Sequence, residues 1–168
     1  MNHKLRWITL IPVILVLCLI CLFSAEDADK STETSGMVVD FVISIILPDF
    51  SSYPIEEQFQ LRMRITHWVR KTAHFTEFAL LGCTLLIHVE AVRLDMPKRG
   101  GPYWPIPTAW AIGTFFAALD EGHQLFVSGR AGQWSDVAID SAGVLTGTVF
   151  GLCMWYATSS WRRSHHIL

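Results

Sequence analysis

Ionisable side chains gather in three short segments of an otherwise apolar chain, at residues 70–77, 120–124 and 130–140. Histidine and carboxylate side chains commonly act as general acids and bases, whereas arginine and lysine hold phosphate or carboxylate groups. The three segments therefore predict a polar site that binds an anion or transfers protons. The ligand-binding residues that we expect are Arg70, Lys71, His74, Glu77, Asp120, Glu121, Gln124, Arg130, Asp136 and Asp140.

Some of these side chains are also candidates for acid–base catalysis or metal binding. The pairs His74–Glu77 and Glu121–His123 offer metal-ligating groups at short spacing. However, the sequence contains no HExxH pattern and no second well-spaced histidine pair, so we expect no metal and no cofactor. The candidate catalytic residues are His74, Glu77, Asp120 and His123.

The composition is typical of a membrane protein. Of 168 residues, 51% are hydrophobic and 17% are charged, and the apolar residues are clustered into runs. The net charge of −2 gives no electrostatic support for a nucleic-acid partner, which we exclude. All four cysteines lie in apolar runs, and we interpret the CxxC at residues 18–21 as packing rather than redox or metal chemistry.

Four apolar runs are long enough to cross a membrane, at residues 7–23, 68–92, 104–127 and 136–156. An α-helix rises about 1.5 Å per residue, so about 20 residues cross a hydrocarbon core of roughly 30 Å. Tryptophan and tyrosine residues stand near the predicted ends, as is typical of the membrane interface. The first run also resembles a signal peptide, but its cleavage site is poor, and we favour a retained span.

Two further segments lie between the first and second runs. Residues 37–47 are apolar but too short to span a membrane, and we expect a re-entrant or interfacial segment there. Residues 24–36 are rich in acidic and hydroxyl side chains, which predicts a solvated linker. The predicted fold is an all-α membrane protein, a bundle of four transmembrane helices with that short segment after the first. The expected divisions are an N-terminal span and acidic linker (1–36), a transmembrane domain (37–157) and a basic cytoplasmic tail (158–168).

Basic residues on short flanks predict the orientation of the spans. Four spans place three basic flanks on one side, so we expect a multi-pass protein of the cytoplasmic membrane with both termini in the cytoplasm. Arg70, Lys71 and Arg130 lie close to the membrane on the opposite side, which breaks the positive-inside rule and suggests a functional reason for them. The cytoplasmic flank residues are Lys4, Arg6, Arg93, Lys98, Arg99, Arg162 and Arg163.

The same topology brings the three polar segments to the extracytoplasmic end of the bundle. Helical offsets of four and seven residues place Arg70, His74 and Glu77 on one face of the second span. Asp136 and Asp140 stand four residues apart at the start of the fourth span and share a face there. The sequence therefore predicts that these groups meet.

Close helix packing is expected just beneath this polar cluster. Glycines recur every four residues over 143–151, on the face that continues from the two aspartates, and this spacing lets helices approach closely. Ionisable groups at membrane depth usually find partners, so we expect Glu77, Asp120 and Glu121 to pair with the basic residues Arg70, Lys71 and Arg130. A purely structural network of ion pairs is the alternative. We favour a functional site, because desolvation makes buried charge a poor source of stability.

The three segments together resemble the motifs of the VanZ-like family. Residues 70–78 read RKTAHFTEF and are similar to its RKxxHFxEY block, and residues 120–124 read DEGHQ and are similar to its DExxQ block. Residues 130–143 resemble its R…D…[ND]xxG block, and the blocks occur in the family's order. The resemblance covers residues 41–156. It departs from the pattern at Phe78, where the family has tyrosine, and in a long loop before the second span.

The resemblance implies a small polytopic bacterial membrane protein, and the namesake of the family is linked to resistance to the glycopeptide teicoplanin. We therefore expect binding of an anionic envelope component, a lipid or wall-precursor headgroup, at the extracytoplasmic face, with a contribution to glycopeptide resistance. The alternative is a membrane-embedded hydrolase or transferase acting on a lipid-linked phosphate, so enzyme and binding protein both stay open. A transporter is disfavoured, because four spans give a small path unless the chain oligomerises. The sequence does not indicate which oligomeric state the chain adopts.

Overall fold

The computed structural model describes residues 3–95, 104–130 and 132–164. These residues form five α-helices and one short 3-10 helix, and they contain no strand, which confirms the all-α fold class. The basic residues Lys98 and Arg99, which contributed to the predicted orientation, lie outside the described residues. In chain order the elements are α1 (His3–Ser24), α2 (Ala28–Ile46), η1 (Phe50–Ser52), α3 (Ile55–Asp95), α4 (Pro105–Gln124) and α5 (Trp134–Ser164).

Three helices in the described part of the chain are long and apolar enough to cross a membrane: α1, α3 and α5. Their candidate spans are Arg6–Ser24, Ile55–Leu94 and Trp134–Thr158. Large apolar side chains such as Leu15, Phe115 and Phe150 are exposed on the surface, as lipid-facing side chains of a membrane bundle would be. These features make the chain a multi-pass membrane protein. Helix α4 is not among the three, so the four-span topology stays a prediction.

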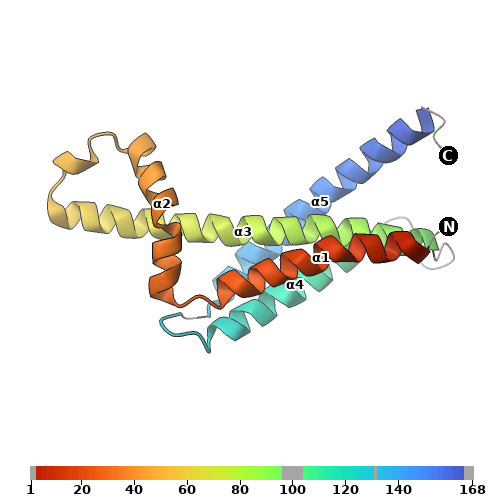
Figure 1. The fold of residues 1–168 in the computed structure, drawn as a ribbon, viewed down its shortest axis with the longest axis horizontal. Helices are drawn as coiled ribbons and strands as arrows, with labels where there is room; N and C mark the ends of the chain where they lie inside the picture. The colour runs from red at the N-terminus through yellow and green to blue at the C-terminus, as the bar shows by residue number, and fades with distance from the viewer. Residues whose placement is uncertain (1–2, 96–103, 131, 165–168) are drawn as a thin grey trace.

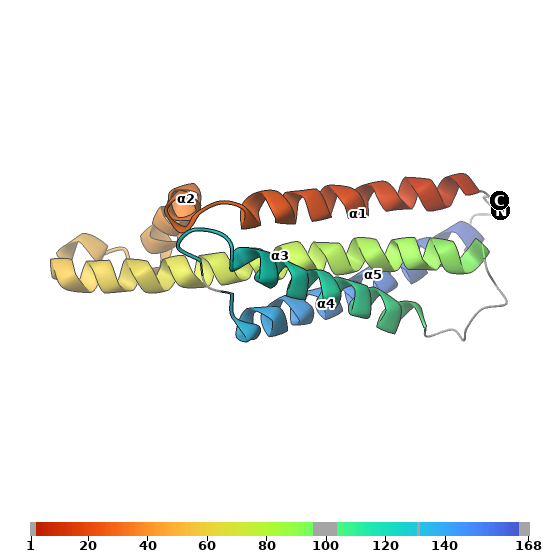
Figure 2. The ribbon, with the colours of Figure 1, turned by 90° about the horizontal axis from the view of Figure 1, so that it is seen from below.

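Helix α3 is the centre of the bundle. Helices α1 and α4 run alongside it, whereas α5 crosses it obliquely (Figures 1 and 2). The side chains of Phe78, Leu81 and Leu86 on α3 are fully buried. They pack in one hydrophobic cluster with residues of α1, α4 and α5, including Ile20 and Val144. Every other helix is therefore positioned by its contact with α3.

Helix α2 covers most of the two segments between the first and second apolar runs. Residues 24–36, predicted as a solvated linker, are helical from Ala28 onward, and the helix runs without a break to Ile46. Asp27 starts it by accepting a hydrogen bond from the backbone N–H of Lys30 at 2.8 Å, the usual role of an aspartate N-cap. The helix then lies across α3 (Figure 1), with Val39 and Ile43 buried. The segment at 37–47 is thus not a separate element but the second half of a longer helix, and its re-entrant or interfacial placement stays a prediction.

Helix α3 also begins earlier than expected. The apolar pattern predicted a span over residues 68–92, but the helix has 41 residues and starts at Ile55. Its first turns extend beyond the ends of α1 and α4 (Figure 1). Arg62 of this extension donates a hydrogen bond to Asp40 of α2, so most of the predicted long loop is helical and is held against α2.

The predicted glycine contact is present between α5 and α3. A methyl group added to Gly143 would meet the backbone carbonyl of Phe75, and one added to Gly147 would overlap the backbone carbonyl of Ala79. Both neighbours are main-chain atoms, which no rotamer change can move. The absence of side chains at these positions therefore sets how closely α5 approaches α3, just below the polar end of the bundle.

We expect Gly147→Ala to destabilise the protein by about 1–3 kcal/mol or more, because the new methyl group forces the two helix backbones apart. Gly36→Ala on α2 is the matched control, since no atom lies within 4 Å of the position that its Cβ would take. Thermal unfolding of the two variants in the same detergent measures the difference. Equal melting temperatures for Gly147→Ala and Gly36→Ala would contradict the close contact.

Candidate functional site

Three helices each deliver one buried or half-buried side chain to the same point. Ligand atoms of His74 on α3, Asp120 on α4 and Asp140 on α5 all lie within 4.8 Å of one another. Asp120 is 7% exposed and Asp140 is 1% exposed. The structure therefore brings together one residue from each of the three polar segments of the sequence, as we predicted.

Hydrogen bonds hold the carboxylates of α4 in place. The Asp120 Oδ2 atom accepts from the Ser24 hydroxyl at 2.7 Å and from the Gln124 amide at 3.0 Å. Glu121 accepts from the same amide at 3.3 Å and from the backbone N–H of Gln133 at 2.9 Å. Gln124 thus bridges two neighbouring acids, and Ser24 ties the end of α1 to the cluster.

Other polar atoms in the cluster have no hydrogen-bond partner among the described residues. Both carboxylate oxygens of Asp140 are buried and unpartnered. The same is true of Nδ1 of His74 and Oε2 of Glu77, which lie 4.0 Å apart, too far for a hydrogen bond. Buried polar groups are normally satisfied, so these atoms identify the part of the bundle where a bound partner would fit.

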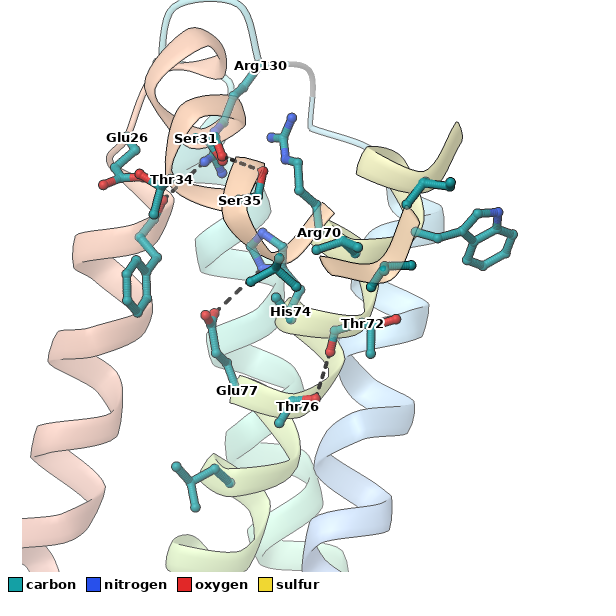
Figure 3. A pocket seen from close by; sticks show the side chains of 18 of the residues that line it. Glu26, Ser31, Thr34, Ser35, Arg70, Thr72, His74, Thr76, Glu77 and Arg130 are labelled. Atoms are coloured by element: carbon teal, nitrogen blue, oxygen red, sulfur yellow. Dashed lines mark hydrogen bonds and ion pairs between the residues drawn. The ribbon is translucent and has the colours of Figure 1, made fainter. Parts of the chain in front are cut away.

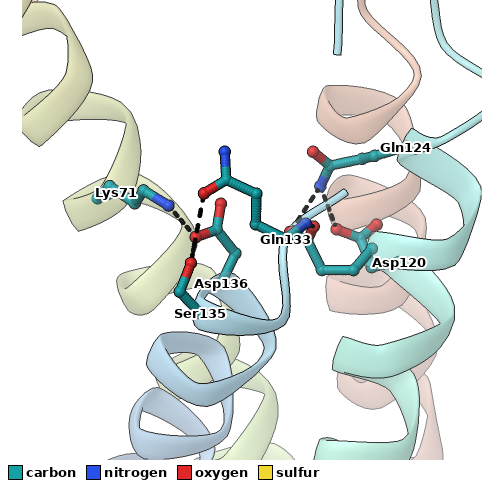
Figure 4. A network of polar contacts seen from close by, with 7 residues as sticks. Lys71, Asp120, Gln124, Gln133, Ser135 and Asp136 are labelled. Atoms are coloured by element: carbon teal, nitrogen blue, oxygen red, sulfur yellow. Dashed lines mark hydrogen bonds and ion pairs between the residues drawn. The ribbon is translucent and has the colours of Figure 1, made fainter. Parts of the chain in front are cut away.

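The cations divide into one paired and two unpaired residues. Lys71 forms an ion pair with Asp136 of α5 rather than with one of the three acids that we expected to pair with the cations (Figure 4). Arg70 and Arg130 form no ion pair with any described carboxylate, so the predicted pairing of these acids with them was wrong. The partner of a long side chain depends on its rotamer and on the axial offset between the helices, and the sequence pattern specifies neither.

Arg130 lies in the loop between α4 and α5 and is only partly satisfied. Its Nη2 donates to the backbone carbonyl of Phe23 at 3.1 Å, so it caps the last turn of α1. Its Nε and Nη1 are buried without a partner. Burial and the like charge of Arg70 lower the pKa of Arg130, although Asp120 and other nearby acids raise it. An added anion would therefore relieve an unfavourable environment around this guanidinium.

A groove of about 920 Å³ opens beside these arginines. Its walls are the end of α1, the inner face of α2 and the middle of α3, and most of the lining is apolar. In Figure 3, Arg70 and Arg130 lie at the upper end of the groove near Ser31 and Ser35, with His74 and Glu77 below them. Apolar lining residues include Phe23, Val38, Val42, Ile46, Val69 and Leu80.

The groove divides the predicted site residues into two sets. Arg70, His74, Glu77 and Arg130 line it. The remaining members do not line it: Lys71, Asp120, Glu121, Gln124, Asp136 and Asp140. His123, a candidate acid or base, is exposed on α4 and is not among the lining residues. His74 lines the groove and is also one of the three residues whose ligand atoms lie within 4.8 Å of one another.

A sequence model of the VanZ/LLP1 family matches residues 9–156. The chain belongs to the VanZ/LLP1 family. The match begins within α1 and ends within α5, so it includes every helix that contributes to the cluster and extends further toward the N-terminus than the motif resemblance did. No curated protein and no solved structure matches the chain.

In this VanZ/LLP1 protein the sequence motifs missed the contributions of α1 and α2. Ser24 is fully buried and donates to Asp120, and the inner face of α2 forms one wall of the groove. Both segments lie where the composition predicted a span end and a solvated linker. The sequence signal for α2 is Asp27, an N-cap residue that is followed by helix-compatible sequence up to the apolar stretch.

Proposed function

We propose that this VanZ/LLP1 protein binds an anionic amphiphile of the cell envelope, a lipid or a lipid-linked wall precursor, at the extracytoplasmic face of the membrane. The observation that carries the proposal is the pairing of an apolar groove with two arginines that have no carboxylate partner in the described structure. The headgroup would bind at Arg70 and Arg130, since guanidinium groups suit phosphate and carboxylate geometry. The hydrocarbon chain would lie along α2 and α3.

The proposed topology has four spans with both termini in the cytoplasm of a bacterial cell. Helix α4 has 20 residues and is about 30 Å long, which matches the hydrocarbon thickness. It packs against α3 and α5, two of the candidate spans. The basic flanks near the ends of the spans support the cytoplasmic assignment. The groove and its arginines would then open toward the outer leaflet.

The paired residues around the site would have a supporting role. Lys71 and Asp136 join α3 to α5 close to Arg70, and Gln124 holds the two neighbouring acids of α4. These contacts hold α3, α4 and α5 together next to Arg70 and Arg130 without occupying the guanidinium groups. The groove therefore has α3, which packs on α5, as one wall and α2 as another.

Lipid retention tests the proposal directly. The full-length protein in detergent is mixed with equal amounts of dioleoyl phosphatidic acid and dioleoyl phosphatidylcholine, and the bound lipids are measured by native mass spectrometry. We expect at least about a tenfold preference for phosphatidic acid, because an arginine contact to an anion contributes about 1.5–3 kcal/mol. Undecaprenyl phosphate is the probe for a lipid-linked precursor. Equal retention of the anionic and zwitterionic lipids would contradict the proposal.

A hydrolase or transferase is the second candidate, and the unpartnered His74 and Asp140 beside the groove favour it. Such side chains act as general bases in phosphate chemistry. The same samples are therefore assayed for inorganic phosphate. Release from phosphatidic acid or undecaprenyl phosphate, lost in His74→Gln, would favour the enzyme, whereas retention without release favours the binding protein.

A further inference from the structure

The cluster of His74, Asp120 and Asp140 has the dimensions of a metal site. Divalent transition metals bind histidine nitrogen and carboxylate oxygen at about 2.0–2.2 Å, so ligand atoms on opposite sides of one ion lie up to about 4.4 Å apart. The three side chains offer atoms that are all within 4.8 Å of one another. Three atoms at this largest separation lie about 2.8 Å from their common centre, so inward shifts of well under about 1 Å would bring all three to bonding distance.

The surroundings of Asp140 favour a bound cation between these three side chains. It is 1% exposed, and neither of its oxygens has a hydrogen-bond partner among the described residues. An ionised carboxylate in such a place is uncompensated, and a protonated one would carry an O–H group with no acceptor. Neither form is satisfied by the surrounding protein, whereas a bound cation would satisfy the ionised form.

Asp120 carries the supporting contacts that metal-binding carboxylates usually have. Its Oδ2 accepts hydrogen bonds from Ser24 and Gln124, at 2.7 and 3.0 Å. Its other oxygen makes no hydrogen bond in the described structure and is available to bind a metal ion. Contacts of this kind orient a ligand and commonly matter almost as much as the ligand itself.

We propose that His74, Asp120 and Asp140 bind one divalent transition-metal ion, with Ser24 and Gln124 holding Asp120 in position. One imidazole and two carboxylates form a mixed ligand set that suits Zn²⁺ or Mn²⁺ better than a purely soft or purely hard ion. The ligands come from α3, α4 and α5, so the ion joins three helices at the end of the bundle. His74 also lines the groove, and the metal site therefore shares a wall with the proposed anion site.

Metal content of the purified full-length protein tests this site. All samples carry His165→Ala and His166→Ala, two histidines outside the described residues, so that the tail does not bind the probe. The protein is stripped with a chelator, exposed to ZnCl₂ or MnCl₂, passed through a sizing column and analysed by elemental mass spectrometry. We expect about one equivalent of Zn²⁺ or Mn²⁺ per chain, and a loss of roughly tenfold or more in Asp140→Asn and in His74→Gln.

Two matched variants separate ligand loss from general damage. Asp49→Asn removes an exposed carboxylate outside the cluster, and His88→Gln removes an α3 histidine that instead contacts Thr9. Both are expected to retain the metal. Asp120→Asn keeps an oxygen that accepts from Ser24 and Gln124, so it folds while losing metal affinity. All variants are compared only as monodisperse, helical samples.

Metal-dependent stability gives a second readout. Saturating Zn²⁺ is expected to raise the apparent melting temperature by roughly 5 °C in the protein with intact ligands and by almost nothing in Asp140→Asn. Metal content that is equal in the intact protein and Asp140→Asn would overturn the proposal, as would equal losses in the ligand variants and the two controls. This inference does not depend on the anionic ligand: a chain that binds metal but shows no lipid preference contradicts the proposed function alone.

Discussion

Replacing both Arg70 and Arg130 with glutamine is expected to abolish the preference for phosphatidic acid. Each guanidinium supplies charge-assisted hydrogen bonds worth about 1.5–3 kcal/mol, so the loss of both corresponds to roughly a hundredfold or more in affinity. Glutamine keeps a polar side chain and removes the charge, which limits the structural change. Native mass spectrometry of the bound lipid measures the effect, with phosphatidylcholine as the internal reference.

Arg64→Gln is the matched control for this variant. Arg64 is an exposed arginine on the extension of α3 and does not line the groove. It is expected to keep the wild-type preference. If the double variant still selects phosphatidic acid, or if Arg64→Gln loses the preference to the same extent, the arginines are not the headgroup site.

The same double variant has a cellular readout. The family resemblance leads us to expect that expression of this chain in a susceptible Gram-positive host raises the inhibitory concentration of teicoplanin. The double variant at equal protein level should not raise it, because the anionic envelope component would no longer be bound. Resistance that persists in the double variant would separate any such phenotype from the groove.

Filling the groove with a bulky side chain is expected to have the second-largest effect. Val42 of α2 lines the groove, and Val42→Trp would occupy space that the hydrocarbon chain needs. The effect is steric: a lipid tail gains little by moving from bilayer to protein, since both surroundings are apolar. We expect retention of dioleoyl phosphatidic acid to fall roughly tenfold, by about 1.4 kcal/mol.

Ile45→Trp is the control for the groove variant, because Ile45 lies on the same helix, is 64% exposed and does not line the groove. Retention is measured for dioleoyl phosphatidic acid and for soluble glycerol phosphate. A purely steric block of the tail leaves glycerol phosphate binding unchanged in Val42→Trp. Unchanged lipid retention in Val42→Trp would show that the hydrocarbon chain lies elsewhere.

Much of the cluster could be predicted from sequence because it depends only on helix periodicity and on the alternation of span direction. Offsets of three and four residues fix the faces of α3 and α5, and antiparallel neighbours bring their polar ends together. This reasoning anticipated that His74, Asp120 and Asp140 would meet, and it anticipated the glycine face that packs on α3. These features need no knowledge of side-chain conformations.

The remaining features depend on tertiary contacts that leave no local pattern. The first half of α2 was interpreted as a linker because it is polar. The second half was interpreted as a separate segment because its apolar stretch is short. Arg130 binds a backbone carbonyl of α1 rather than a carboxylate, and backbone partners cannot be recognised from residue types. The proposed metal ligands lie on three helices, so the short-range spacing used to recognise metal sites could not reveal them.

The contacts at the end of α1 make this helix part of the site rather than a separate anchor. The Phe23 carbonyl accepts a hydrogen bond from Arg130, and the Ser24 hydroxyl donates one to Asp120 of α4. A truncated chain without α1 would leave a guanidinium and a carboxylate short of partners and would lose one wall of the groove. A fusion or deletion that begins after residue 27 therefore alters the chemistry of the site as well as the number of membrane crossings.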